Sequence, residues 1–272
     1  MHPDLQRRVQ RYGWDKAATY YENCWLEQLK PAHDLLMEIS DVQEDEQILD
    51  IAAGTGLVSF RLIDKAGANG NLMATDISDA MVAIGNEICE SKKLRNISFK
   101  RMDAENLDCE NDTFNIATCA LGFMYFPEPE KALSEIYRVL KPDGRAVIAV
   151  WGSRKNCGWA DIFPIIDKRV SSDVCPMFFS LGEGSVLKYL FENTGFKHIE
   201  IQKIETTLHY NSSKEACDAS FLGGPVAMAY SRFDDEAKKE ARKEYLNSIK
   251  RFKTMRGYEI PGEFVICRGI KN

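Results

Sequence analysis

Three aspartates follow three successive apolar runs of the chain, and each could help to bind a ligand. Asp50 lies in the first run, Asp76 closes the second, and Asp103 comes just after the third. If these runs are parallel strands, their carboxyl ends meet at one edge of a sheet, where open α/β sheets bind ligands. A single aspartate at a strand end often serves only as a turn or cap residue. Three of them in register favour a common binding site.

A turn of small residues follows the first aspartate. It runs from Ala52 to Gly56 and includes Gly54, so the backbone can bend sharply and a ligand can approach closely. No lysine follows as in a phosphate loop, and Ser59 stands where the dinucleotide signature Gly-x-Gly-x-x-Gly needs its third glycine. An acidic Asp50 would repel a pyrophosphate and attract an ammonium or sulfonium group. The turn therefore favours a cationic nucleoside.

The other two aspartates suit the rest of such a nucleoside. Asp76 lies 20 residues after Gly56, a spacing at which an acidic side chain can accept hydrogen bonds from both ribose hydroxyls. Asp103, followed by Ala104, is placed to accept a hydrogen bond from the exocyclic amine of adenine.

The elements that must position these residues alternate between strand and helix from residue 46 to 151. Alternation of this kind predicts a mostly parallel, doubly wound α/β sheet. We expect its strands at 47–51, 71–75, 97–101, 114–119 and 146–151, and its helices at about 57–65, 79–92 and 129–140. Ser78 is the expected N-cap of the second helix, and residues 141–144 should form a tight turn. Later strands are expected at 198–210 and 263–268.

The segments outside this alternation are mostly helical. We expect residues 1–45, which are rich in aromatic residues, to form an N-terminal helical lid. Residues 46–211 and 259–272 should form the core, and residues 212–258 a helical insertion in the substrate region.

The composition is that of an ordinary soluble globular protein. The net charge of −6 argues against a general nucleic-acid or anionic-membrane surface. No apolar run approaches the roughly 20 residues of a membrane span, and the N-terminus has no apolar signal-peptide core. The eight cysteines are scattered without metal-ligand spacing, so we expect free thiols, no metal site and a cytoplasmic location.

Taken together, these motifs resemble those of the class I S-adenosylmethionine-dependent methyltransferases over roughly residues 45–151. The segment Asp50–Gly56 is similar to their first motif, with Ala52 where many members have glycine. Asp76 resembles their ribose-binding acidic residue, and Asp103-Ala104 resembles their adenine motif. Residues 119–122 and 138–144 resemble the later motifs. The last run is most similar to the ubiquinone/menaquinone methyltransferases and related small-molecule enzymes.

The resemblance implies a fold, a cofactor and a set of binding residues. The implied sheet has seven strands in the order 3-2-1-4-5-7-6, with the last strand antiparallel. The implied cofactor is S-adenosylmethionine, with S-adenosylhomocysteine as its product. The expected cofactor-binding residues are Asp50, Ala52, Gly54, Gly56, Asp76, Ile77, Met81, Asp103, Ala104 and Cys119.

Aromatic residues near the expected strand ends indicate an apolar or aromatic methyl acceptor. The expected substrate-pocket residues are Tyr20, Trp25, Phe123, Tyr125, Trp151 and Trp159. The catalytic residue stays open. Its candidates are His33, His209 and Tyr21. A surface or capping role is the favoured interpretation for each of the two histidines, and no convincing acid–base pair stands out.

The leading hypothesis is methyl transfer to the O, C, N or S atom of a small acceptor. A protein or RNA methyltransferase and a non-catalytic module that binds S-adenosylmethionine remain alternatives. The missing third glycine disfavours an NAD-dependent oxidoreductase. The expected partners are a small-molecule acceptor and a second copy of the chain in a homodimer, and no nucleic acid is expected.

Overall fold

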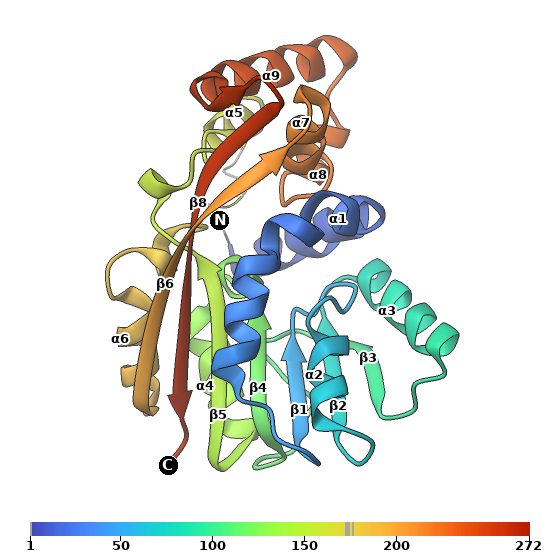
Figure 1. Cartoon of the computed structure of the whole chain (residues 1–272), viewed down its shortest axis with the longest axis vertical. Helices are drawn as coiled ribbons and strands as arrows, with labels where there is room; N and C mark the ends of the chain where they lie inside the picture. Colours follow the sequence, from blue (N-terminus) through green and yellow to red (C-terminus); the bar gives the residue numbers. More distant parts are fainter. Residues whose placement is uncertain (1, 172–174, 176) are drawn as a thin grey trace.

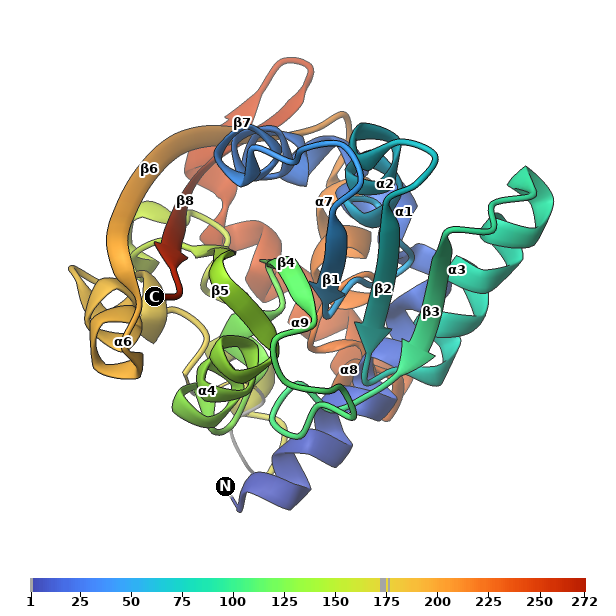
Figure 2. The ribbon, with the colours of Figure 1, turned by 90° about the horizontal axis from the view of Figure 1, so that it is seen from below.

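One twisted sheet with helices on both faces forms the centre of the molecule (Figures 1 and 2). This computed structural model describes residues 2–171, 175 and 177–272. The strands are β1 (Gln47–Ile51), β2 (Asn71–Asp76), β3 (Ile97–Arg101), β4 (Phe114–Ala120), β5 (Leu140–Trp151), β6 (Lys197–Tyr210), β7 (Lys253–Thr254) and β8 (Gly257–Ile270).

The strand order is β3-β2-β1-β4-β5-β8-β6, with β7 paired to β8. Strands β1 to β5 are parallel, and β8 runs antiparallel to both β5 and β6. The predicted order is therefore confirmed for the long strands, β8 being the seventh of them. The described sheet has eight strands rather than seven, because the two-residue β7 pairs with the start of β8.

The helices are α1 (Pro3–Ser40), α2 (Ser59–Ala66), α3 (Asp79–Lys92), α4 (Pro129–Val139), α5 (Ile162–Asp167), α6 (Val186–Thr194), α7 (Ser213–Phe221), α8 (Ala227–Ser231) and α9 (Asp235–Ser248), with short 3-10 turns at η1 (Phe123–Tyr125), η2 (Arg154–Asn156), η3 (Ser180–Gly182) and η4 (Lys250–Phe252). Ser78 caps α3 as predicted, its hydroxyl accepting a hydrogen bond from the backbone N–H of Met81 at 3.2 Å.

The central strands explain the apolar runs of the sequence. Ile48, Leu49 and the stretch Ala146–Val150 are fully buried, because layers of helix cover both faces of a parallel sheet. The turn expected at residues 141–144 is instead included in β5. Phe114 pairs with Leu140, but the next paired residues are Ile116 and Arg145, so the intervening chain bulges.

Helix α1 is one continuous helix whose two halves pack against different parts of the molecule. Its C-terminal half lies along the sheet, and its N-terminal half crosses the carboxyl ends of the strands, close to α3 and α8 (Figure 1). The Arg145 side chain fixes the end of the helix, since it donates to the Ser40 carbonyl at 2.6 Å and pairs with Glu46 at 2.7 Å. The indole of Trp25 donates to the Gly223 carbonyl at 2.9 Å.

Helices α7, α8 and α9 gather at the same end of the molecule as the N-terminal half of α1 (Figure 1). The division into a core and two added segments, 1–45 and 212–258, stays a prediction. Within the described residues, no helix is both long and apolar enough to cross a membrane.

Candidate functional site

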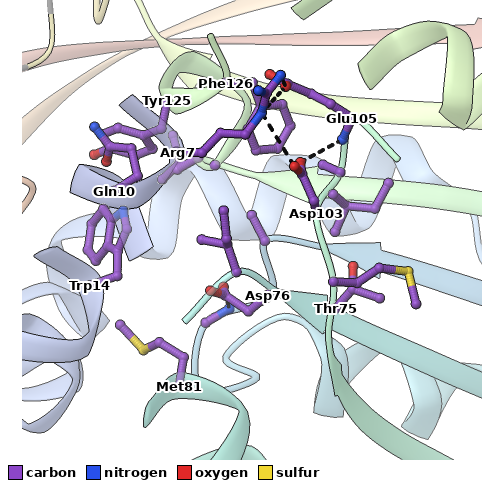
Figure 3. Close-up of a pocket in the computed structure, with 18 of the residues that line it drawn as sticks. Arg7, Gln10, Trp14, Thr75, Asp76, Met81, Asp103, Glu105, Tyr125 and Phe126 are labelled. Atoms are coloured by element: carbon purple, nitrogen blue, oxygen red, sulfur yellow. Dashed lines mark hydrogen bonds and ion pairs between the residues drawn. The ribbon is translucent and has the colours of Figure 1, made fainter. Parts of the chain in front are cut away.

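A pocket opens where β1, β2 and β4 end and where α1 crosses them (Figure 3). Its polar wall comes from the sheet and its cover from the helix. The residues that line it include Arg7, Gln10, Trp14, Tyr21, Ala52, Gly54, Asp76, Ile77, Met81, Met102, Asp103, Ala104, Glu105, Leu121, Gly122, Tyr125 and Phe126.

Asp76 is the buried carboxylate of this wall. Its oxygens accept hydrogen bonds from the backbone N–H groups of Gly54 and Ser78, each at 2.9 Å. Burial raises its pKa to about 6, against the opposing effect of these two bonds, and the charge of Asp15 adds to the rise. A carboxylate offers about four acceptor positions. Asp76 therefore has capacity left for hydroxyl groups of a ligand.

Two tight turns face each other beside Asp76. Ala52 follows β1 with a φ of 52° and Leu121 follows β4 with a φ of 63°, both in the left-handed region that side chains disfavour. A Cβ atom on Gly122 would lie 2.2 Å from the Cβ of Ala52, so the second turn needs glycine. Both turns line the pocket, and strained backbone of this kind is typical of ligand sites.

Arg7 of α1 contacts Asp103, the third predicted carboxylate (Figure 3). Its Nε lies 3.4 Å from Asp103 and donates to Glu105 at 2.6 Å, and its guanidinium also pairs with Glu128. Only 1% of the Glu105 side chain is exposed, so this carboxylate depends on Arg7 for its charge partner. Arg7 could not be predicted as a site residue from the sequence, because it lies 98 residues from Glu105 in the chain and no local pattern marks the pair.

The structure places three expected cofactor residues outside the pocket lining. Asp50 is fully buried and accepts hydrogen bonds from Ser59 at 2.5 Å and Thr118 at 2.7 Å, so it braces the turn from below rather than facing a cationic ligand. Burial raises its pKa to about 6. Cys119 is buried too, because neighbouring strand residues point to opposite faces and Ala120 lines the pocket instead.

Gly56 also lies off the pocket lining. Its φ is 100°, and a Cβ there would lie 2.6 Å from the ring of Phe60, so this glycine lets α2 pack beneath the turn. The other expected cofactor residues do come together around the pocket: Ala52, Gly54, Asp76, Ile77, Met81, Asp103 and Ala104.

A second, aromatic pocket adjoins the first. The two share Trp14, Tyr21, Leu121 and Tyr125. Its other lining residues are Trp25, Leu29, Trp151, Trp159, Ile162, Phe178, Ser220, Gly224, Pro225 and Val226. No charged side chain is among the described residues that line it. This pocket suits a small apolar or aromatic molecule.

Four of the six expected substrate residues, Trp25, Tyr125, Trp151 and Trp159, line this aromatic pocket. Tyr20 does not line it. Neighbouring residues of an α-helix point in different directions, so the side chain of Tyr20 points away from that of Tyr21 and is 46% exposed. Phe123 is fully buried and packs its ring on Phe126, with centroids 5.2 Å apart, so it serves the core.

The candidate bases occupy three different environments. Tyr21 lies where the two pockets meet, and burial together with the charge of Asp76 raises the pKa of its hydroxyl, so it stays protonated at neutral pH. His33 is a buried residue of α1 that lines neither pocket, and burial lowers its pKa to about 4. His209 lies in a separate groove, where its backbone bonds to Gln28.

Thiol and metal chemistry find little support around this site. All eight cysteines are free, and burial raises the pKa of Cys157 to about 12, so this thiol stays protonated. Within the ranges that the structure describes, no three His, Cys, Asp or Glu residues gather as metal ligands would.

Comparison with known proteins agrees with the geometry. The sequence profile of the ubiE/COQ5 methyltransferase family matches residues 24–174. The ubiquinone/menaquinone biosynthesis C-methyltransferase UbiE of Rhizobium etli is 40% identical over 153 residues, which are 54% of this chain and 57% of that protein. The Brucella abortus UbiE is 41% identical over 98 residues, 36% of each chain. The chain thus spans little more than half the length of such relatives.

Solved structures share the fold. A methyltransferase-like protein of Bacillus halodurans superposes with a TM-score of 0.63 at 22% identity, over 88% of this chain and 98% of that one. Phosphoethanolamine N-methyltransferase 2 of Haemonchus contortus, solved with S-adenosyl-L-methionine, gives a TM-score of 0.59 at 15% identity, over 89% of this chain and 52% of that one.

The sheet order, the glycine turn and the carboxylates at the strand ends are those of the class I S-adenosylmethionine-dependent methyltransferase fold. Within that class, the chain belongs to the ubiE/COQ5 methyltransferase family, whose profile covers more than half of its 272 residues.

Proposed function

We propose that this protein transfers a methyl group from S-adenosylmethionine to a ring carbon of a small, largely apolar quinol-type acceptor. The observation that carries the proposal is the meeting of two unlike pockets at Tyr21 and Tyr125. One has the carboxylates of Asp76 and Asp103 on its wall, and the other is aromatic and uncharged over its described lining. A polar nucleoside suits the first pocket and an apolar ring suits the second.

The residues of the first pocket fit the cofactor. Asp76 would accept hydrogen bonds from the ribose hydroxyls, Asp103 and Ala104 would bind the adenine edge, and the turn at Gly54 leaves room for the amino-acid part. When bound, the cofactor supplies an electrophilic methyl group on a sulfonium. The role of the chain is then to hold the acceptor close and aligned, which can contribute about 7–11 kcal/mol.

The choice of a ring carbon rests on the state of the groups at the junction. Tyr21 and Tyr125 stay protonated, since burial raises the pKa of both hydroxyls, and no histidine lines either pocket within the described residues. An acceptor that carries its own nucleophile, such as a carbon beside a phenolate, needs little help from a protein base. The UbiE relatives named above are C-methyltransferases of ubiquinone and menaquinone biosynthesis, which supports the same acceptor class.

Calorimetric titration with S-adenosylmethionine, and with NADH as a control, tests the cofactor assignment. Methyl transfer is then measured by mass spectrometry with a naphthohydroquinone, a simple phenol and a thiol. We expect binding of S-adenosylmethionine alone, and a methyl group on a ring carbon of the naphthohydroquinone. Binding without transfer to any ring acceptor would instead favour a non-catalytic module. Transfer to RNA or protein would favour a macromolecular substrate.

A further inference from the structure

Trp159 lines the aromatic pocket and has a buried polar atom that the described residues leave without a partner. The indole nitrogen Nε1 of Trp159 is buried, and the described residues offer it no hydrogen-bond acceptor. A buried indole N–H usually finds a partner, and leaving one unpaired costs free energy. Such an exception in a pocket calls for an explanation, and a ligand that brings an acceptor atom provides one.

Two other polar side chains of the pocket, Trp25 and Ser220, are already engaged inside the protein. Trp25 donates its indole N–H to the Gly223 carbonyl at 2.9 Å. The hydroxyl of Ser220 donates to the Tyr245 hydroxyl at 2.6 Å. Trp159 therefore differs from Trp25 and Ser220, because its buried N–H has no acceptor among the described residues.

The fold holds Trp159 rigidly. Its ring makes edge contacts with Trp151 and Phe178, with centroids 4.8 and 5.5 Å away. Its carbonyl accepts a hydrogen bond from Ile162 at 3.2 Å, and the preceding Gly158 donates to Pro261 at 2.8 Å. A donor fixed in this way can select a ligand by the position of its acceptor atom, because little side-chain freedom is lost on binding.

We propose that Trp159 is a specificity-determining residue whose indole N–H donates a hydrogen bond to an oxygen on the ring of the acceptor. This proposal rests on the proposed function, because it takes the aromatic pocket as the acceptor site. An unpaired donor, with no charged side chain in the described lining, suits a neutral or delocalised oxygen better than an ammonium group. A site built around such a donor discriminates against the analogue that lacks the oxygen.

The test uses two ligands of one shape, 1-tetralone, whose ketone accepts a hydrogen bond, and tetralin, which has none. Calorimetry measures both in the full chain saturated with S-adenosylhomocysteine. We expect the wild type to prefer 1-tetralone about fivefold, as one net hydrogen bond would give. Trp159→Phe should bind the two equally. Trp25→Phe is the matched control, because the Trp25 N–H already donates to a carbonyl of the protein. The lost packing should weaken the binding of both ligands equally, so the preference for 1-tetralone should remain.

Each result bears on one assignment. If S-adenosylhomocysteine does not bind the wild type, the proposed function fails. If it binds to all three proteins but Trp159→Phe still prefers 1-tetralone, the role of Trp159 is overturned while the cofactor site stands. A wild type with no preference for 1-tetralone overturns it equally. Unfolding curves of the three proteins show whether a variant has lost its structure, and in that case Trp159→Leu, which also lacks a donor, replaces Trp159→Phe.

Discussion

Asp76 is a buried carboxylate that we expect to accept hydrogen bonds from the ribose hydroxyls of the cofactor. Replacing it with alanine removes the acceptor for the ribose hydroxyls and frees the N–H groups of Gly54 and Ser78. Hydrogen bonds to a charged group contribute about 1.5–3 kcal/mol, so we expect Asp76→Ala to bind S-adenosylhomocysteine at least tenfold more weakly by calorimetry. The exposed Asp79, three residues on, gives the control Asp79→Ala. Equal affinity in a folded Asp76→Ala protein would contradict the assignment.

The raised pKa of Asp76 predicts a pH dependence of cofactor binding. The carboxylate is charged above about pH 6 and protonated below it, and a protonated acid is the poorer acceptor. Affinity for S-adenosylhomocysteine should therefore be constant near pH 8 and fall as the pH drops through 6, by up to about tenfold per pH unit. Asp76→Asn should remove most of this slope. A wild-type affinity that does not change between pH 5 and 8 would refute the prediction.

At the scale of elements, the turns after β1 and β4 depend on each other. A methyl group on Gly122 would collide with the Cβ of Ala52, so Gly122→Ala should lower the free energy of unfolding by about 1–3 kcal/mol. Ala52→Gly removes the opposing atom and relaxes the positive φ of that residue. The double variant should recover much of the loss. Urea unfolding of the four proteins measures the coupling, and strictly additive effects would show that the turns act independently.

The prediction that the N-terminal part of α1 acts as a lid can be tested at Arg7. This side chain connects the N-terminal turns of α1 to Glu105 and Glu128 beside the pocket. Arg7→Ala leaves the buried Glu105 without its partner, so we expect faster amide hydrogen exchange in the first turns of α1 and a higher association rate constant for S-adenosylhomocysteine. The exposed neighbour Arg8 provides the control Arg8→Ala. Exchange rates that match those of the wild type would show that packing alone holds the helix.

For the whole molecule, the two buried carboxylates predict how stability varies with pH. The pKa of both Asp50 and Asp76 is raised to about 6, so the folded chain binds these protons more tightly than the unfolded chain does. This tighter proton binding stabilises the folded chain at low pH, and the stabilisation is lost as the pH rises from about 4 to about 6. Between pH 4.5 and pH 7.5, the free energy of unfolding of Asp50→Asn should therefore change more favourably than that of the wild type, by about 2 kcal/mol. Urea unfolding at both pH values checks this, and parallel pH profiles would exclude a role for Asp50.

Several features could be predicted from the sequence because they depend on local pattern. The apolar run Ile48–Ile51, the Ser78 cap and the alternation of strand with helix each arise from neighbouring residues, and together they predict the mostly parallel sheet. The strand order was implied by the family resemblance and not by these local patterns. The carboxylate of Asp76 belongs to the same group. Its place after the strand and its spacing from the glycine turn already put it at the ligand edge.

Other features were decided only by the tertiary structure. Asp50 is in the same stretch as the glycine turn, yet its side chain reaches Thr118 on another strand and faces the interior. Arg7 meets Glu105 across 98 residues, and the packing around Trp159 places no acceptor among the described residues beside its indole N–H. Side-chain direction and long-range pairing depend on how elements pack. The sequence therefore determined the class and the edge where the ligand binds, and packing decided which side chains face that ligand.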